Sequence, residues 1–131
     1  MLGIDTNVLV RILIRDDAEQ FARAEELIRR ERDARRPVLI SLLVLLETEW
    51  VLRSCYKLSK AEILATLDRL LNSCDVCFED ESTVVGALFI WRDAPTQLAD
   101  CLICLRYREL KCRATGSFDA SALELPWFAS V

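Results

Sequence analysis

Four acidic residues lie where a folded protein could use them for chemistry: Asp5, Glu47, Asp100 and Asp119. Asp5 directly follows a short apolar segment, residues 2–4, and Asp119 follows a candidate strand, residues 114–117. Glu47 and Asp100 lie near the starts of expected helices. Because ligands of α/β proteins bind beyond the carboxyl ends of parallel strands, we expect the four carboxylates to converge.

Clustered carboxylates repel one another unless a cation lies among them. At about 5 Å and an effective dielectric constant near 20, each pair repels by about 3 kcal/mol, so the acids would take up protons without a counter-ion. Ligands that are all oxygen favour a hard ion, Mg²⁺ or Mn²⁺, over zinc. Such an ion activates water and neutralises phosphate during cleavage of a phosphodiester bond. The acids therefore predict a metal-dependent hydrolase.

The helix expected over residues 42–53 carries two glutamates in different surroundings. Glu49 has Arg53 four residues later, which is typical of a solvent-exposed ion pair. Glu47 has apolar neighbours on both sides, so we expect its face of the helix to turn inward together with Trp50. A buried carboxylate needs a positive partner, and this face offers no lysine or arginine. This contrast favours Glu47 as the functional glutamate.

Taken singly, the aspartates at positions 5, 100 and 119 also fit a structural role. Each lies near the end of an expected element, where aspartate commonly caps a helix or stays in solvent. Spacing alone does not choose between the two roles.

Short apolar segments alternate with helical ones along the chain. We expect strands near residues 2–4, 38–40, 76–78 and 114–117, and helices after Thr6 and Asn7 and over about 17–32, 42–53, 60–71, 82–92 and 95–108. Thr6 or Asn7 is the expected cap of the first helix, Ser41 and Ser82 are expected caps of two later helices, and Ser59 with Glu62 forms a capping box. This order predicts an α/β fold with a mostly parallel sheet covered by helices on both faces.

The composition is that of one soluble domain spanning residues 1–131. The chain is 53% hydrophobic and 29% charged, with three glycines and no histidine. The lack of histidine excludes a Ser-His-Asp triad and zinc sites that need imidazole, and the scattered glycines exclude the common nucleotide-binding loops. A net charge of −4 disfavours nucleic-acid binding by phosphate neutralisation alone. It leaves open binding through a metal ion.

We expect a cytoplasmic protein that does not enter the membrane. No apolar run approaches the roughly 20 residues that span a bilayer, and Asp5 and Arg11 interrupt the place of a signal peptide. The six cysteines are then expected to be reduced. The pairs Cys74/Cys77 and Cys101/Cys104 have the spacing of a zinc site, but their expected places in a strand and a helix favour buried thiols.

Two basic segments, residues 29–36 and 106–113, have two interpretations. Each can be a solvated helix end that the helix dipole stabilises, or a surface that guides phosphates.

The acids occur within recognisable segments. These are Leu-Gly-Ile-Asp5-Thr6-Asn7, then Ser41 six residues before Glu47-Thr-Glu-Trp, then Leu-Ala-Asp100, then Thr-Gly-Ser117-Phe-Asp119. In this order, over about residues 1–128, they resemble the PIN-domain family, specifically VapC-like toxin ribonucleases of type II toxin–antitoxin systems.

The resemblance implies a PIN-like three-layer sandwich and a Mg²⁺- or Mn²⁺-dependent endoribonuclease that cleaves RNA through one or two ions. It also implies a homodimer and a small antitoxin protein that blocks the acidic pocket. Many relatives carry a basic residue after the last acid, where this chain has Ala120, so the direct ligation of metal by Asp119 stays open. The metal-binding and catalytic residues that the resemblance implies are Asp5, Glu47, Asp100 and Asp119, supported by hydrogen bonds from Thr6, Asn7 and Ser117.

Two other functions fit parts of the pattern. A catalytically silent PIN-like module that only binds a protein would fold in the same way. A phosphatase of the haloacid-dehalogenase type also has an aspartate after its first strand, but its motif needs a second aspartate where this chain has Asn7.

Overall fold

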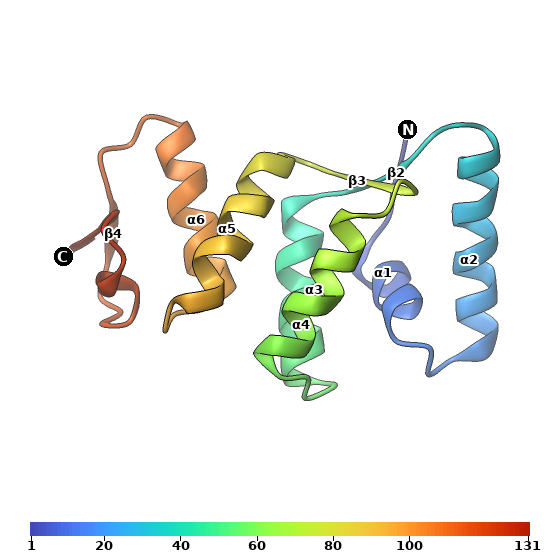
Figure 1. The fold of residues 1–131 in the computed structure, drawn as a ribbon, viewed down its shortest axis with the longest axis horizontal. Coiled ribbons are helices and arrows are strands. Elements are labelled where there is room, and N and C mark those ends of the chain that lie inside the picture. Colours follow the sequence, from blue (N-terminus) through green and yellow to red (C-terminus); the bar gives the residue numbers. More distant parts are fainter. The chain divides into compact units, whose positions relative to one another are not determined.

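The computed structural model describes all residues from Met1 to Val131 (Figure 1). The chain divides into two compact units, Met1–Glu79 and Asp80–Val131, and each is described by itself. None of the six helices combines the length and the apolar character that a bilayer-spanning segment needs.

The first unit contains a three-stranded parallel sheet in the order β1-β2-β3. Its strands are β1 (Leu2–Gly3), β2 (Val38–Ile40) and β3 (Val76–Phe78). The central strand β2 is the most buried, with Val38 and Ile40 fully enclosed. Because the strands are parallel, their carboxyl ends lie at one edge of the sheet, and the chain leaves that edge at Asp5, Ser41 and Glu79.

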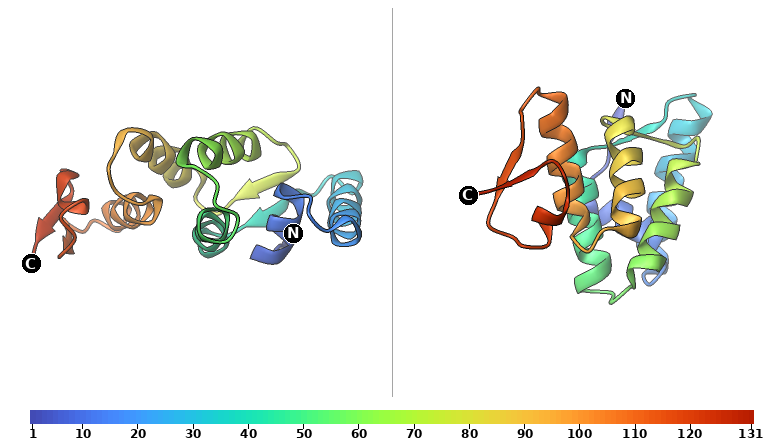
Figure 2. Two further views of the ribbon diagram at one scale, coloured as in Figure 1. Left: turned by 90° about the horizontal axis from the view of Figure 1, so that it is seen from below. Right: turned by 60° about the vertical axis from the view of Figure 1, so that its left-hand side comes forward.

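Four helices complete the first unit: α1 (Thr6–Leu13), α2 (Ala18–Asp33), α3 (Leu42–Ser54) and α4 (Lys60–Leu71). Helix α1 packs against α2 and α3, and α4 packs against α3 and β3. Figures 1 and 2 both show α1 and α2 side by side. The first helix is thus held between two neighbours just after Asp5.

The second unit is built on two helices, α5 (Glu81–Asp93) and α6 (Leu98–Glu109), which pack against each other. Trp91 is buried and donates its indole N–H to the carbonyl of Thr96 at 3.1 Å. Strand β4 (Thr115–Ser117) pairs in parallel with β5 (Phe128–Ser130), and the short 3₁₀ helix η1 (Ala122–Glu124) lies in the connection. Residue Asp119 therefore belongs to a crossover between two parallel strands.

The sequence correctly predicted the α/β class, the small parallel sheet and most elements. Ser41 caps α3, and Ser59 and Glu62 form the expected capping box of α4. The expectation that Ser82 caps α5 was wrong. The cap is Asp80, at φ 54°, and its carboxylate accepts hydrogen bonds from the hydroxyls of Ser82 and Thr83. Aspartate tolerates this left-handed conformation because its short side chain bonds locally.

Two further expectations were wrong. Helix α6 begins at Leu98, later than expected, with Gln97 as its cap. Strand β5 was not expected at all, and it is the partner of β4. Strand β4 had been expected as the fourth strand of one larger sheet.

Candidate metal site

Asp5 connects the first strand to the first helix. Its backbone is extended, and its Oδ1 accepts the N–H of Val8 at 3.0 Å, which makes Asp5 the N-cap of α1. The sequence suggested Thr6 or Asn7 as the cap, and this was wrong: both lie inside the helix. Aspartate is among the preferred N-caps, and Asp5 precedes Thr6 and Asn7 in the chain. Only Oδ1 accepts a hydrogen bond, so Oδ2 keeps its lone pairs for another ligand.

Glu47 lies in the second turn of α3 and shares a pocket with Asp5. The pocket has a volume of about 270 Å³, and Thr6, Asn7 and Leu43 also line it. The carboxylate of Glu47 is exposed and makes no hydrogen bond or ion pair within the protein. The structure thus brings together two carboxylates from different elements, together with the polar residues of the Asp5 segment.

The expectation that Glu47 lies on a buried face of α3 was wrong. The buried glutamate is Glu49, only 3% exposed, whose Oε1 accepts Arg53 Nε at 2.8 Å. Trp50 is 53% exposed and Glu47 lies on the exposed face. The segment is apolar on every side, which hides the true buried stripe from periodicity. Exposure nevertheless leaves Glu47 accessible to an ion, whereas Glu49 is occupied by its ion pair. The buried residues of α3 are Leu45, Thr48, Glu49 and Leu52.

Asp100 lies in the first turn of α6 and is engaged by the preceding loop. Its Oδ2 accepts the hydroxyl of Thr96 and the N–H of Gln97, the latter at 3.3 Å. Thr96 is buried and Asp100 is half-buried. The carboxylate therefore helps to fix the start of the helix, with Oδ1 left without a hydrogen bond.

Asp119 is held in a tight polar turn after β4. Its Oδ1 accepts the backbone N–H and the hydroxyl of Ser121 at 2.9 and 2.8 Å, and its own N–H donates to Ser117 Oγ at 2.9 Å. The bond from the Ser121 hydroxyl is the main reason that the pKa of Asp119 is lowered. Asp119 is exposed, so this turn presents a fixed negative charge to solvent.

The carboxylate oxygens of the candidate residues fit a hard divalent ion. No group of three or more acidic or cysteine side chains lies close enough within either unit to form a complete metal cage. Mg²⁺ needs no such cage, because it keeps several waters and binds through one or two carboxylates plus substrate phosphates. Asp5 and Glu47 offer that number of carboxylates in one pocket. Convergence with Asp100 and Asp119 stays a prediction.

Glu79 is an acid at the sheet edge that the sequence analysis missed. It follows β3, and its Oε1 accepts the N–H of Leu42 at 2.9 Å in the first turn of α3. Ser41 Oγ accepts the N–H of Val44 at 3.1 Å in the same turn. Together they hold the start of the helix that carries Glu47. The available signal was an acid directly after the third strand, as Asp5 is after the first.

The first basic segment is largely neutralised by neighbouring acids. Its ion pairs support the interpretation as a solvated helix end, since paired guanidinium groups are less available to phosphate. The pairs are Arg29–Glu26, Arg29–Asp33, Arg30–Glu26, Arg32–Asp75 and Arg36–Glu31. In the second segment, Arg106 pairs with Glu109, and Arg108 lies over the ring of Trp127 at 4.5 Å.

The cysteines are free thiols in the structure. Cys101 and Cys104 are buried within α6, where Cys104 Sγ donates to the carbonyl of Cys101 at 3.3 Å. Burial raises the pKa of the Cys104 thiol. These two residues therefore behave as core side chains of the helix.

Comparison with known families covers nearly the whole chain. The family model described as PIN domain matches residues 3–126, and so includes all four candidate acids. No curated protein matches the chain as a relative. PIN domains are generally nucleases and typically depend on divalent metal ions. From the match and the α/β architecture, the chain belongs to the PIN domain family.

Proposed function

We propose that this protein is a Mg²⁺- or Mn²⁺-dependent endoribonuclease that uses Asp5, Glu47, Asp100 and Asp119. The observation that carries the proposal is the pocket shared by Asp5 and Glu47, in which neither carboxylate has a positive partner. Two like charges in one pocket favour a bound cation. The family membership supports nuclease chemistry at this pocket.

The protein's own groups prepare the site in distinct ways. Asp5 Oδ1 stays in the helix cap, which fixes the carboxylate and leaves Oδ2 as the oxygen that would hold the ion. Glu47 lines the same pocket from α3, a helix whose start is fixed by Ser41 and Glu79. When bound, the ion supplies an activated water and neutralises the phosphate under attack.

The remaining proposed residues have supporting or less direct roles. Asn7 lines the pocket and presents an amide that can orient water, and Thr6 begins the helix that Asp5 caps. Ser117 holds the turn of Asp119, and the hydroxyl of Ser121 lowers the pKa of that carboxyl group. In this proposal Asp100 completes the ion's ligands, and Asp119 supports a second ion or a water.

The more specific proposal is a VapC-like toxin in the cytoplasm, acting on RNA as a homodimer and held inactive by a small antitoxin protein. It rests on the order and flanks of the acids. A gene for a small DNA-binding protein beside this one would support it. Co-expression of that neighbour should then restore growth of cells in which this chain is toxic.

The test of the ribonuclease proposal uses Asp5→Asn and Glu47→Gln in the full chain. Each substitution keeps the shape of the side chain and removes its charge, so we expect normal folding. Mg²⁺-dependent RNA cleavage should fall about 100-fold or more. This exceeds the roughly 10- to 100-fold loss typical of residues that only hydrogen-bond to a metal's ligands. Glu25→Gln, an exposed acid of α2 with no bonded partner, is the matched control and should keep full activity.

Binding of the ion is measured separately from cleavage. Calorimetric titration with Mn²⁺ should show binding to the native chain and weaker binding to both site variants. Cleavage that is unchanged in both variants would contradict the proposal. A native chain that binds neither Mn²⁺ nor Mg²⁺ would instead favour the silent protein-binding module.

A further inference from the structure

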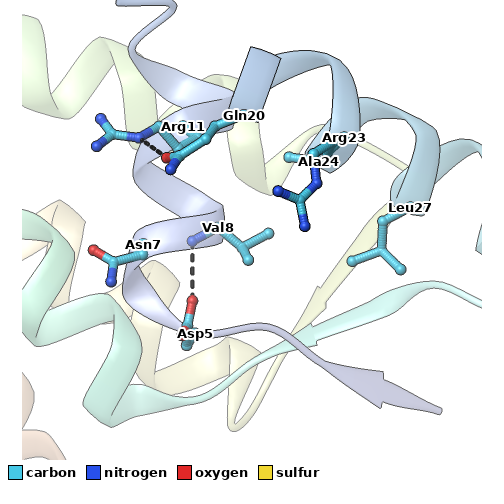
Figure 3. Close-up of a pocket in the computed structure, with 8 residues that line it drawn as sticks. All are labelled: Asp5, Asn7, Val8, Arg11, Gln20, Arg23, Ala24 and Leu27. Carbon is cyan, nitrogen blue, oxygen red and sulfur yellow. Dashed lines mark hydrogen bonds between the residues drawn. The ribbon is translucent and has the colours of Figure 1, made fainter. Parts of the chain in front are cut away.

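A second pocket opens on the other side of Asp5, between α1 and α2. It has a volume of about 400 Å³. Asp5 and Asn7 line both this pocket and the one that contains Glu47. A ligand here would therefore lie directly beside whatever the acidic pocket binds. The residues that line only this second pocket are Val8, Arg11, Gln20, Arg23, Ala24 and Leu27 (Figure 3).

The two arginines of this pocket differ in their availability. Arg11 already has three partners: its Nε donates to Gln20 at 2.6 Å, and one terminal nitrogen donates to Asp16 and to Tyr56 at 3.1 Å. Arg23 is exposed and makes no hydrogen bond or ion pair. Figure 3 shows Arg23 reaching into the gap between the two helices, while the guanidinium of Arg11 points away from that gap with its Nε bonded to Gln20.

Arg23 is also exceptional among the arginines of its own helix. The other three on α2, Arg29, Arg30 and Arg32, each pair with an acid. A guanidinium without a partner, beside a pocket, is the group that best binds a phosphate. The charge at this place thus suits an anion.

The walls of the pocket are mainly apolar. Val8 from α1 faces Leu27 of α2 across the gap, and Ala24 lies beside them (Figure 3). Pockets that bind small ligands combine such apolar walls with a few polar groups that fix orientation. A nucleotide has both parts, a flat base that can pack on apolar side chains and a phosphate that can pair with arginine.

We propose that this pocket binds the nucleotide next to the cleaved phosphodiester, with Arg23 on its phosphate and Val8, Ala24 and Leu27 against its base. The inference rests on the ribonuclease function proposed above and adds a binding subsite to it. Arg23 is a substrate-binding residue in this arrangement and takes no part in bond cleavage.

The first test is binding of single nucleotides to the full chain in EDTA, so that no metal contributes and no RNA is cut. Methyl NMR signals of Val8 and Leu27 report the apolar walls. Nucleoside 5′-monophosphates should shift both signals, and ribose 5-phosphate, which lacks a base, should shift them much less. Arg23→Gln should weaken nucleotide binding about five- to tenfold through the lost charge-assisted contact. Arg30→Gln removes the same charge from the same helix, outside the pocket, and should leave binding unchanged.

The second test is steady-state cleavage of RNA with Mg²⁺. Arg23→Gln should raise KM about five- to tenfold and change kcat less than twofold, because the residue binds substrate and does not touch the reacting bond. The salt dependence of RNA binding should fall by about one unit of slope, as for one lost phosphate contact. A merely structural role would move none of these quantities.

The outcomes separate this inference from the ribonuclease proposal. Nucleotides that leave the Val8 and Leu27 signals unshifted overturn the subsite, even where Asp5→Asn abolishes cleavage. If nucleotides shift both signals but Asp5→Asn leaves cleavage unchanged, the nucleotide pocket is supported and the catalytic proposal fails. A protein segment that perturbs these methyl groups, with no response to nucleotides, also overturns the subsite.

Discussion

The carboxylate of Asp5 accepts the amide of Val8 at 3.0 Å, so the residue that follows β1 also begins α1. One side chain thus has a structural oxygen and a chemically available one. The two roles can be separated by substitution, because asparagine keeps the cap and alanine removes it.

The cap predicts different stabilities for two variants at this position. Asp5→Ala should lower the free energy of unfolding by about 1 kcal/mol, whereas Asp5→Asn should lower it by less than about 0.5 kcal/mol, since asparagine caps helices as well as aspartate does. Urea unfolding at neutral pH measures both. Equal losses in the two variants would show that the cap does not stabilise the protein.

The buried ion pair of Glu49 with Arg53 predicts a larger effect. Arg53→Ala leaves the carboxylate of Glu49, which is 3% exposed, without its partner. The free energy of unfolding should fall by about 2 kcal/mol. This is less than the roughly 3–5 kcal/mol usual for a broken buried pair, because the arginine side chain is itself 39% exposed. The double variant Glu49→Gln/Arg53→Ala should cost less than Arg53→Ala alone, because it leaves no buried charge. Chemical denaturation tests both, and a single variant as stable as the native chain would argue against the pair.

Glu26 predicts a pH dependence of stability. Hydrogen bonds from Arg29, and then from Arg30, lower its pKa from 4.5 to about 2. The unfolded chain therefore binds this proton first on acidification, so the contribution is fully present above about pH 4.5 and is lost as the pH falls toward 2. Urea midpoints of the native chain and Glu26→Gln should differ at pH 7 and converge near pH 2. A difference that does not change with pH would contradict this assignment.

The turn around Asp119 predicts a shift in acidity without a change of fold. Ser121→Ala removes the hydroxyl that is the main cause of the lowered pKa of Asp119, so this pKa should rise toward its ordinary value. Carbon-detected NMR titration of the carboxyl group measures it. Ser130→Ala, on β5, is the control and should leave the titration unchanged. The same pKa in the Ser121 variant and the native chain would rule out this hydrogen bond as the cause.

Local signals predicted most of the fold, and they failed where several candidates competed or where packing decided. Ser41 and Ser59 were identified because each is followed by a clear helix. Asp5, Thr6 and Asn7 are all good caps, and the sequence did not reveal that the first is used. In α3, Glu47 and Glu49 differ by two positions on a helix that is apolar on every side, so only packing decides which is buried.

The candidate site was predicted in part for the same reasons. Asp5 was found because it follows the first strand, and it does share a pocket with Glu47. Glu79 follows β3 in the same way and was missed. The single unpaired arginine of α2 was not found, because pairing on a helix surface depends on side-chain geometry that spacing only suggests. Arg23 has acidic neighbours along the sequence, yet none of them binds it.

The pairing of β4 with β5 ties Asp119 to residues much later in the chain. Thr115, Gly116 and Ser117 lie in register with Phe128, Ala129 and Ser130, so the loop that bears this carboxylate is fastened at both of its ends. This loop can move away from the strands only if the hydrogen bonds between β4 and β5 break. Because both of its ends are fixed, it has less conformational entropy than a free tail of the same length. Slow exchange of the Thr115 amide with solvent deuterium would be the visible sign of that closure, since it donates to the carbonyl of Trp127 at 2.9 Å.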